Sequence, residues 1–304
     1  PGQALGVAVA GDYAYVADGL AGLRVIDVSD PQGPVERGYW DTPVASWGVA
    51  VAGDYAYVAD YSGGLRVIDV SDPRNPVERG YCQTPDDARG VAVAGGYAYV
   101  ATEYAGLRVI DVSNPRNPEA RGCCETPGKA MGVAVAGDYA YVADSEYGLS
   151  IINAADPSSP VAVGVIDTPG SAVDVTLAGS LAYVADSKGG LQVINIANPL
   201  MPFVEGYYKR SGCFAMSVTY EAGHVYVADG PAGFGIYRFD LLSGTVDNLV
   251  NWDYDLEVHP NPAKDKISVS IELGSSQNLK IELYNLEGQM IKSLCDRNED
   301  QGTF

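Results

Sequence analysis

Hydrophobic and small or polar positions alternate along the first part of the chain. In the stretch GVAVAGDYAYVAD, Val7 and Val9 fall on one side of an extended chain, and Gly6, Ala8 and Ala10 fall on the other. A period of two is the period of a β-strand, and no 3.6-residue rhythm is present. The pattern predicts a strand that has one bulky face and one nearly bare face.

The residues that follow complete a unit of four strands. Gly11-Asp12 separates two alternating runs and is expected to form a hairpin turn. GLRVIDV, which begins at Gly22, is rich in β-branched residues and predicts a third strand. VERGYW at 35–40 predicts a fourth, more polar strand. We expect the first strand to lie innermost in such a unit and the charged fourth strand at its outer edge.

This unit recurs along the chain. A copy of YVAD, or a close variant, begins at Tyr15, Tyr57, Tyr99, Tyr141, Tyr183 and Tyr226, so the spacing is 42 residues four times and then 43. A period of about 40–45 residues with several short strands is typical of propeller blades. The 36 glycines and 18 prolines disfavour helical repeats. We therefore predict an all-β fold, a six-bladed β-propeller of four-stranded antiparallel blades.

The sixth unit, at 216–240, shows three strands and no clear fourth. The missing strand could come from 245–250 or from upstream, or a whole blade could lie upstream. Seven blades therefore stay the alternative. The chain also opens in the middle of a repeat, which we interpret as a missing N-terminal part.

The third strands carry the phrase LRVIDV, at 23–28, 65–70 and 107–112, and each copy is followed by Ser, then Asp or Asn, then Pro. This phrase and its period resemble the LVIVD repeat family, over about residues 1–240. The sixth unit, GIYRFDLLSG, departs from the pattern because it has no proline. The resemblance implies a surface-exposed propeller of bacteria or archaea, in a family whose members mostly have no assigned activity.

The rhythm stops after Asp240. VHPNPAKDKISVSI followed by LKIELYNLEGQMIKSL resembles the C-terminal sorting domain of the type IX secretion system, and the matching residues are Pro260, Asn261, Pro262, the strand 267–271, and 283–292 with Gly288 in its turn. The usual final strand is absent, so we expect a truncated domain that forms an incomplete β-sandwich. The resemblance implies handling by the type IX secretion machinery and a secreted or outer-membrane surface location. The expected domains are a propeller at 1–246, a linker at 247–257 and the sorting domain at 258–304.

Charge and composition exclude several classes of partner. The formal net charge of −20 would repel nucleic acid, whose binding depends on cationic side chains that neutralise phosphates. No apolar run approaches the ~20 residues of a membrane span, so none is predicted. The five cysteines have neither zinc-site spacing nor an expected disulfide framework.

Motifs for catalysis are missing from the sequence. It has no nucleophile elbow, zinc-protease motif, Walker loop or dinucleotide fingerprint, and only two histidines, so no cofactor or metal is predicted. An aspartate follows the second strand in five of six units, with Thr102 in the remaining one; the five are Asp18, Asp60, Asp144, Asp186 and Asp229. We interpret them as acceptors of hydrogen bonds from their own loops rather than as a cation site.

A ligand site is expected among the loop residues that do not repeat. The loops between second and third strands and the loops between blades should share one face of a propeller. Aromatic and Arg residues are favoured at binding hot spots. The candidates are Trp47, Arg89, Tyr104, Tyr147, Asp174, Lys188 and Phe214, within a wider set that includes Tyr61, Asp86, Asp87, Glu103 and Lys129.

Three functions fit these features. The first is a non-enzymatic secreted or cell-surface binding or adhesion propeller with an unknown protein or glycan ligand. The second is a secreted propeller enzyme that acts on polysaccharide or phosphoester. The third is a structural spacer for an upstream domain.

Overall fold

The computed structural model describes residues 2–209, 212–238, 257–259, 268–270, 277–284 and 290–299. The chain divides into two compact units, Pro1–Thr245 and Val246–Phe304. Each unit is described by itself. The first unit contains the repeats, and the regular elements among its described residues are β-strands apart from one short 3-10 turn.

The first five repeats each form a four-stranded antiparallel sheet, as predicted. Blade 1 contains β1 (Gly6–Ala10), β2 (Tyr13–Ala17), β3 (Leu23–Asp27) and β4 (Val35–Trp40), and blade 2 contains β5 (Gly48–Ala52), β6 (Tyr55–Ala59), β7 (Leu65–Asp69) and β8 (Val77–Cys82). Blade 3 contains β9 (Ala88–Ala94), β10 (Tyr97–Thr102), β11 (Gly106–Asp111) and β12 (Glu119–Cys124), and blade 4 contains β13 (Gly132–Ala136), β14 (Tyr139–Ala143), β15 (Leu149–Asn153) and β16 (Val161–Ile166). Blade 5 contains β17 (Asp174–Ala178), β18 (Leu181–Ala185), β19 (Leu191–Asn195) and β20 (Phe203–Tyr208).

Blade 6 has three described strands, β21 (Ser217–Glu221), β22 (His224–Ala228) and β23 (Phe234–Arg238), with the 3-10 turn η1 (Gly230–Ala232) between the last two. The six blades confirm the predicted all-β propeller. The candidate closing strand at 245–250 lies outside the described residues.

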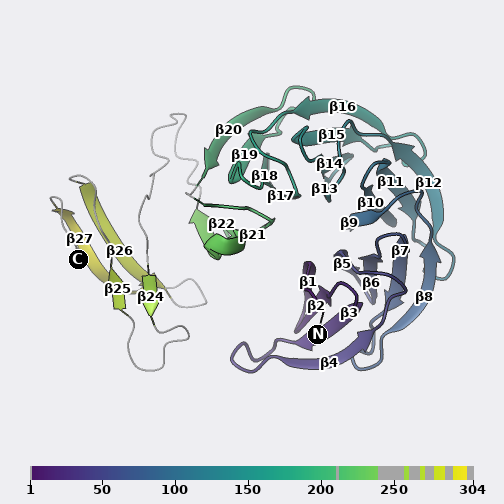
Figure 1. The fold of residues 1–304 in the computed structure, drawn as a ribbon, viewed down its shortest axis with the longest axis horizontal. Coiled ribbons are helices and arrows are strands. Elements are labelled where there is room, and N and C mark those ends of the chain that lie inside the picture. The colour runs from purple at the N-terminus through teal and green to yellow at the C-terminus, as the bar shows by residue number, and fades with distance from the viewer. Residues whose placement is uncertain are drawn as a thin grey trace. The chain divides into compact units, whose positions relative to one another are not determined.

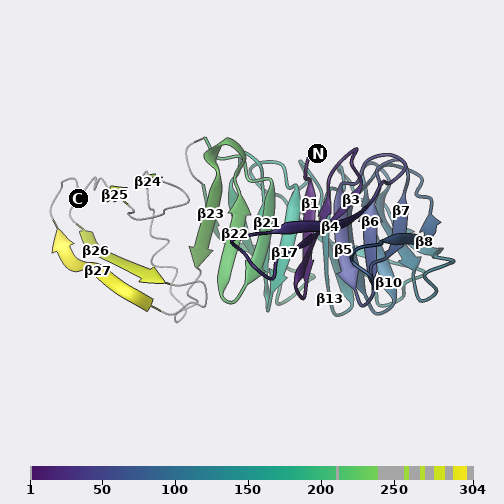
Figure 2. The same ribbon diagram turned by 90° about the horizontal axis from the view of Figure 1, so that it is seen from below.

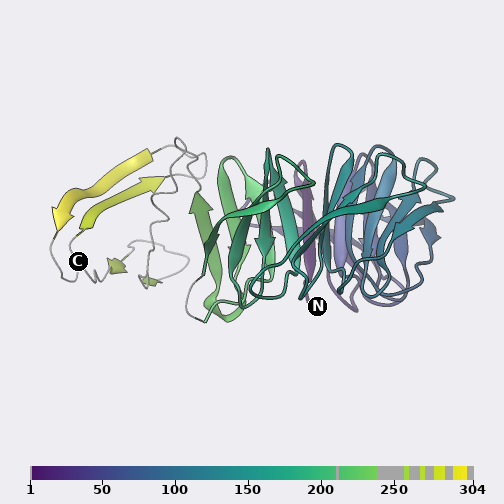
Figure 3. The same cartoon turned by 90° about the horizontal axis from the view of Figure 1, so that it is seen from above.

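The blades follow one another around a central axis (Figure 1). Their first strands lie innermost and their fourth strands form the outer rim, as expected. Successive innermost strands lie side by side from β1 to β21. The side views show these strands standing upright across the ring (Figures 2 and 3). The ribbon leaves a sector open between blade 1 and blade 6.

Each blade has two different faces. We call the first the valine face; in blade 3 it contains Val91, Val93, Val100 and Ile110. We call the opposite one the tyrosine face; in blade 2 it contains Tyr55, Tyr57, Leu65 and Val67. These two sets form one buried cluster, and the same pairing joins every blade to the next, from blade 1 to blade 6. Tyrosines and small residues of one blade thus receive the valines of its neighbour, which explains the alternation in the sequence.

Glycines allow the innermost strands to approach closely. A Cβ atom added at Gly48 would lie 2.6 Å from the carbonyl oxygen of Arg89, and one added at Gly90 would lie 2.6 Å from that of Met131. A side chain at these two positions would force the strands apart. The equivalent position of the first strand is Gly in four blades, Gly6, Gly48, Gly90 and Gly132, and it is Asp174 and Ser217 in the other two.

The second unit contains two described antiparallel pairs. In the first, β24 (Glu257–His259) pairs with β25 (Ser268–Ser270), and in the second, β26 (Gln277–Tyr284) pairs with β27 (Met290–Glu299). The predicted motif residues Pro260, Asn261, Pro262 and Gly288 lie outside the described residues.

Two further expectations concern the cysteines and membrane-spanning segments. Cys82, Cys123, Cys124 and Cys213 are free thiols. In the described part of the chain, no helix has the length and hydrophobicity needed to cross a membrane.

Candidate functional site

Two sets of loops meet at one end of the propeller. Isolated β-bridges join the loop between the second and third strands of one blade to the loop that enters the next blade, and they pair Gly19 with Ser46, Tyr61 with Ala88, Ser145 with Ala172, and Ser187 with Ala215. We call the surface formed by these two loop sets the loop face. The prediction that both sets share one face is therefore confirmed.

Arg89 lies over two aromatic rings on the loop face. Its guanidinium carbon is 3.9 Å from the centre of the Trp47 ring and 4.9 Å from the centre of the Tyr61 ring. The two rings are themselves stacked, with their centroids 6.1 Å apart and their planes at 24°. A cation over aromatic faces is attracted by the ring quadrupole. The three side chains thus form a preformed unit between blades 2 and 3.

Tyr61 adopts a backbone conformation that glycine usually takes. Its φ angle is 50°, in the left-handed region, and the equivalent positions in blades 1 and 6 are Gly19 and Gly230. Backbone hydrogen bonds in both directions between Tyr61 and Ala88, of 3.2 and 2.9 Å, hold it there. The hydroxyl of Tyr61 donates to Asp87, and this bond raises the pKa of the tyrosine above its usual value.

Glu103 joins this unit to the next blade. Its carboxylate, 8% exposed, accepts hydrogen bonds from Arg89 and from the Lys129 ammonium, the latter at 2.7 Å. Burial alone would raise the pKa of the Glu103 carboxyl, but the hydrogen bonds and charges of Lys129 and Arg89 outweigh it and hold that pKa below its usual value. Glu103 is therefore an anion that fixes two cations from different loops.

Tyr104 is the most exposed aromatic residue of the cluster. Its side chain is 67% exposed, and the Lys129 ammonium lies 4.6 Å from the centre of its ring. Its backbone N–H donates to Asp86 Oδ2 at 2.7 Å. The loop between β10 and β11 and the loop that enters blade 4 thus position an exposed ring and a cation side by side. We call the whole set the Arg89 cluster: Trp47, Tyr61, Arg89, Glu103, Tyr104 and Lys129.

Of the seven predicted residues, the structure brings three together, Trp47, Arg89 and Tyr104. Tyr147 and Lys188 are exposed on the loop face of blades 4 and 5, and the ring of Tyr147 lies beside Gly128, the residue that precedes Lys129. Phe214 is half-buried in the loop that enters blade 6, where its N–H donates to Asp229 Oδ1 at 2.7 Å.

Asp174 has a packing role. Its Oδ2 atom accepts hydrogen bonds from the Ser217 hydroxyl at 2.7 Å and from the Val218 N–H at 3.0 Å. Burial raises the pKa of its carboxyl. The carboxylate fastens blade 5 to the first strand of blade 6, so the structure gives a packing reason for Asp at a position where four blades have Gly.

The sequence did not single out Tyr61, Glu103 or Lys129, although all three belonged to the non-repeating loop residues. The signal available in the sequence was the position of Glu103 within its repeat. Glu103 occupies the site where other blades have Gly, Tyr or Ser. Glu103 lies one repeat after Tyr61 and 14 residues after Arg89 of its own repeat, so its role becomes evident only once the loops are known to touch.

Four of the five repeated aspartates, Asp18, Asp144, Asp186 and Asp229, accept hydrogen bonds as interpreted, but their partners were placed wrongly. Asp144 accepts from the Thr126 hydroxyl at 2.8 Å and the Gly128 N–H at 3.1 Å, and Asp186 accepts from Gly170 N–H at 2.8 Å. These donors lie in the loop that enters the same blade, not in the loop that contains the aspartate. Burial raises the pKa values of both carboxyls. Among the described residues no group of three or more His, Cys, Asp or Glu side chains could hold a metal ion.

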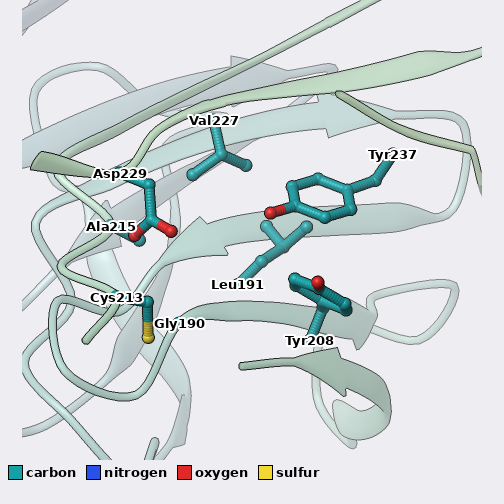
Figure 4. Close-up of a pocket in the computed structure, with 8 residues that line it drawn as sticks. All are labelled: Gly190, Leu191, Tyr208, Cys213, Ala215, Val227, Asp229 and Tyr237. Carbon is teal, nitrogen blue, oxygen red and sulfur yellow. The ribbon is translucent and has the colours of Figure 1, made fainter. Parts of the chain in front are cut away.

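Two hollows lie between blades. The one between blades 5 and 6, drawn in Figure 4, is lined by Leu191, Tyr208, Val227 and Tyr237 with neighbouring residues, and it has no room for a water-sized molecule. The rings of Tyr208 and Tyr237 are 4.5 Å apart. The other hollow, of about 220 Å³, lies beside Arg108 and Arg121. The first hollow is therefore packed core and no ligand site.

Comparison with solved structures shows the same fold in proteins of unrelated sequence. A putative 6-phosphogluconolactonase from Bacteroides fragilis has 12% identity and a TM-score of 0.66, over 79% of this chain and 81% of that one. A chain of the mitotic checkpoint complex has 11% identity and a TM-score of 0.66, over 77% and 73%. The computationally designed Ika8 protein has 7% identity and a TM-score of 0.59, over 78% and 71%. At these identities the similarity shows the fold alone.

Family comparison covers both units of the chain. The LVIVD repeat matches at residues 1–42, 45–84, 85–126, 127–168 and 169–209. A secretion system C-terminal sorting domain matches at 257–303, which indicates handling by the type IX secretion machinery and a secreted or outer-membrane surface location in a bacterium. No curated protein matches the chain in sequence. The chain therefore belongs to the LVIVD repeat family, as a propeller that carries a sorting domain for export.

Proposed function

We propose that this exported propeller is a non-enzymatic binding protein whose loop face engages a protein or glycan through the Arg89 cluster. One observation carries the proposal: residues of three successive blades form one connected cluster, in which the buried Glu103 carboxylate binds Arg89 and Lys129, and Arg89 in turn lies over Trp47 and Tyr61. Such a convergence is not needed to build a blade, because blades 5 and 6 have no counterpart of it among the described residues.

The cluster has the chemistry of a recognition surface. Aromatic and Arg side chains dominate the binding energy of most interfaces, and rigid side chains lose little entropy on binding. Trp47 and Tyr61 are already stacked under Arg89, and Glu103 fixes Lys129 beside the exposed ring of Tyr104. A ligand would meet an aromatic ring and a cation whose positions are set in advance.

The short loops favour binding over catalysis. Between the second and third strands, blades 2 to 5 have loops of three to five residues, so no long insertion encloses a substrate at this end of the ring. Exposed polar and aromatic side chains on short loops suit a macromolecular partner better than a small substrate, since small-molecule sites are concave.

The experiment is a screen of the purified chain on glycan and peptide arrays, with four variants of the same chain. Trp47→Ala, Tyr104→Ala and Lys129→Ala should each weaken the best hits by about tenfold or more, as expected for hot-spot residues. Tyr207→Ala is the matched control for Tyr104→Ala, because Tyr207 is also an exposed aromatic residue and lies on the outer strand β20. Hits that survive the first three substitutions, or turnover of a polysaccharide or phosphoester by the isolated chain, would refute the proposal.

A further inference from the structure

In the part of the chain that the structure describes, two blade faces, one on blade 1 and one on blade 6, have no neighbouring blade packed against them. At the five contacts between successive blades, the tyrosine face of one blade packs on the valine face of the next. The valine face of blade 1 and the tyrosine face of blade 6 are left over. They border the open sector of the ring (Figure 1).

The valine face of blade 1 is apolar and exposed. Val7 and Val9 are 65% and 67% exposed, although they occupy the positions of Val49 and Val51, which pack against blade 1. Val16 and Ile26 are half-buried, whereas their counterparts in blade 2, Val58 and Ile68, are fully buried. The same residues that form a core elsewhere therefore face outward here.

The tyrosine face of blade 6 is exposed in the same manner. Phe234 and Ile236 are 64% and 58% exposed, and they stand where Leu65 and Val67 are fully buried in blade 2. The ring of Tyr226 stacks with that of Phe234, with centroids 6.1 Å apart. This face keeps the apolar character that the other blades bury against a neighbour.

The two faces do not meet each other. Sheets packed face to face lie about 10 Å apart, and valines at such a contact are buried. The innermost strands β1 and β21 do not lie side by side as the other successive pairs do, and both faces remain exposed. The sector between them is therefore wider than a single contact between blades.

Blade 1 also offers the loop that a preceding blade would contact. The N–H of Gly2 donates to Asp18 Oδ2 at 2.9 Å, as Gly128 does to Asp144 at 3.1 Å and Gly170 to Asp186 at 2.8 Å. Residues 2–5 thus take the conformation of the loop that enters blades 4 and 5. Blade 1 has the complete binding edge of an interior blade.

We propose that the open sector binds one further blade of the LVIVD type, which places its tyrosine face on Val7 and Val9 and its valine face on Phe234 and Ile236. The five contacts within the chain define this occupant, because in each of them a valine face packs on the tyrosine face of another blade. A second copy of the chain is a poorer fit, since the blades behind its first blade would need the space that blade 1 already fills.

The test supplies the blade. A copy of residues 43–84 is fused in front of Pro1, which keeps the repeat in register because Pro1, Pro43 and Pro85 are equivalent. We expect the melting temperature to rise by about 5 °C or more, since burial of two apolar faces adds stability to a domain of this size. We also expect hydrogen exchange of β1 and β23 to slow by about tenfold or more.

Matched variants separate docking from a general effect of the fusion. Val7→Asp with Val9→Asp should leave the unfused chain almost unchanged, because both side chains are exposed, but should abolish the stabilisation by the fused blade. Val35→Asp, an exposed valine on the outer strand β4, should leave that stabilisation intact.

Two results would overturn the proposal. One is a fused blade that is degraded by protease while β1 exchanges as fast as in the unfused chain. The other is an unfused chain that sediments as a dimer and becomes monomeric with Val7→Asp, because the occupant would then be a second copy.

Discussion

The Lys129 ammonium lies 2.7 Å from Glu103 Oε1, and it reaches there from the loop that enters blade 4. Arg89 reaches the same carboxylate from the start of β9 in blade 3. The carboxylate is nearly buried, so both cations are needed to stabilise its charge, and the carboxylate in turn holds both cations in place. The loop face is therefore organised around one anion, and this arrangement leads to the first prediction.

Glu103→Gln should destabilise the loop face. The substitution removes the charge that pairs with Arg89 and Lys129, and hydrogen bonds to charged groups contribute about 1.5–3 kcal/mol each. We expect the free energy of unfolding in urea to fall by about 2 kcal/mol. Glu146→Gln, in the exposed equivalent loop of blade 4, is the control and should change little. An unchanged midpoint for Glu103→Gln would show that the cluster does not stabilise the fold.

The outer rim should make stability sensitive to acid. Asp27 and Asp111 have pKa values of about 2, because the hydroxyl and N–H of the following serines and the guanidinium of an arginine ten residues later bind the charged form; the same groups lower the pKa of Asp69. A lowered carboxyl pKa gives stability that is present above the unfolded value near 3.8 and is lost as pH falls toward 2.

The test compares the unchanged chain with a triple variant that combines Asp27→Asn, Asp69→Asn and Asp111→Asn. Its melting temperature should lie below that of the unchanged chain at pH 5–7, and the two curves should converge as pH falls from about 4 to 2. A constant difference between the curves across that window would contradict the assignment.

Ala120→Glu should give Arg108 a partner. In blades 1 and 2 the equivalent arginines, Arg24 and Arg66, lie 3.8 and 3.7 Å from Glu36 and Glu78. Arg108 has no ion pair among the described residues, because Ala120 stands at the glutamate position and Thr102 at the position of Asp18 and Asp60, the other partners of Arg24 and Arg66. We expect a gain of about 0.5 kcal/mol in urea, as for other partly exposed pairs. The gain should vanish with Ala120→Gln, or when Arg108→Gln accompanies Ala120→Glu.

Asp174→Gly should loosen blade 6 alone. The change restores the residue found in four other blades but deletes hydrogen bonds to Ser217 and Val218, together worth about 2 kcal/mol. Hydrogen exchange should quicken in β21–β23 and stay unchanged in β5–β16. Equal changes in all blades would mean that Asp174 acts on the whole ring.

Much of the fold could be predicted from the sequence because each blade repeats the same physical solution. The alternation at Val7 and Val9 fixes the strand period, and the 42-residue spacing of the tyrosines fixes the blade. The candidate face followed from connectivity alone. The contacts on it did not, because Lys129 reaches Glu103 from the next repeat, and Arg89 meets Trp47 and Tyr61 of the preceding one.

Other residues resisted prediction for similar reasons. Asp174 departs from the glycine pattern for a partner 43 residues away, which no local pattern reveals. The partners of Asp144 and Asp186 lie in the incoming loop, 16 and 18 residues earlier, and a reading of each loop by itself assigned them wrongly.

The central claim is that ligand recognition occurs at the loop face of blades 2 to 4. Covalent footprinting of the chain with and without its best array ligand tests this claim most directly. We predict that Tyr104 and Lys129 become protected while Tyr207 on the outer rim reacts as before. Protection at Tyr207 with unchanged reactivity of Tyr104 and Lys129 would contradict it.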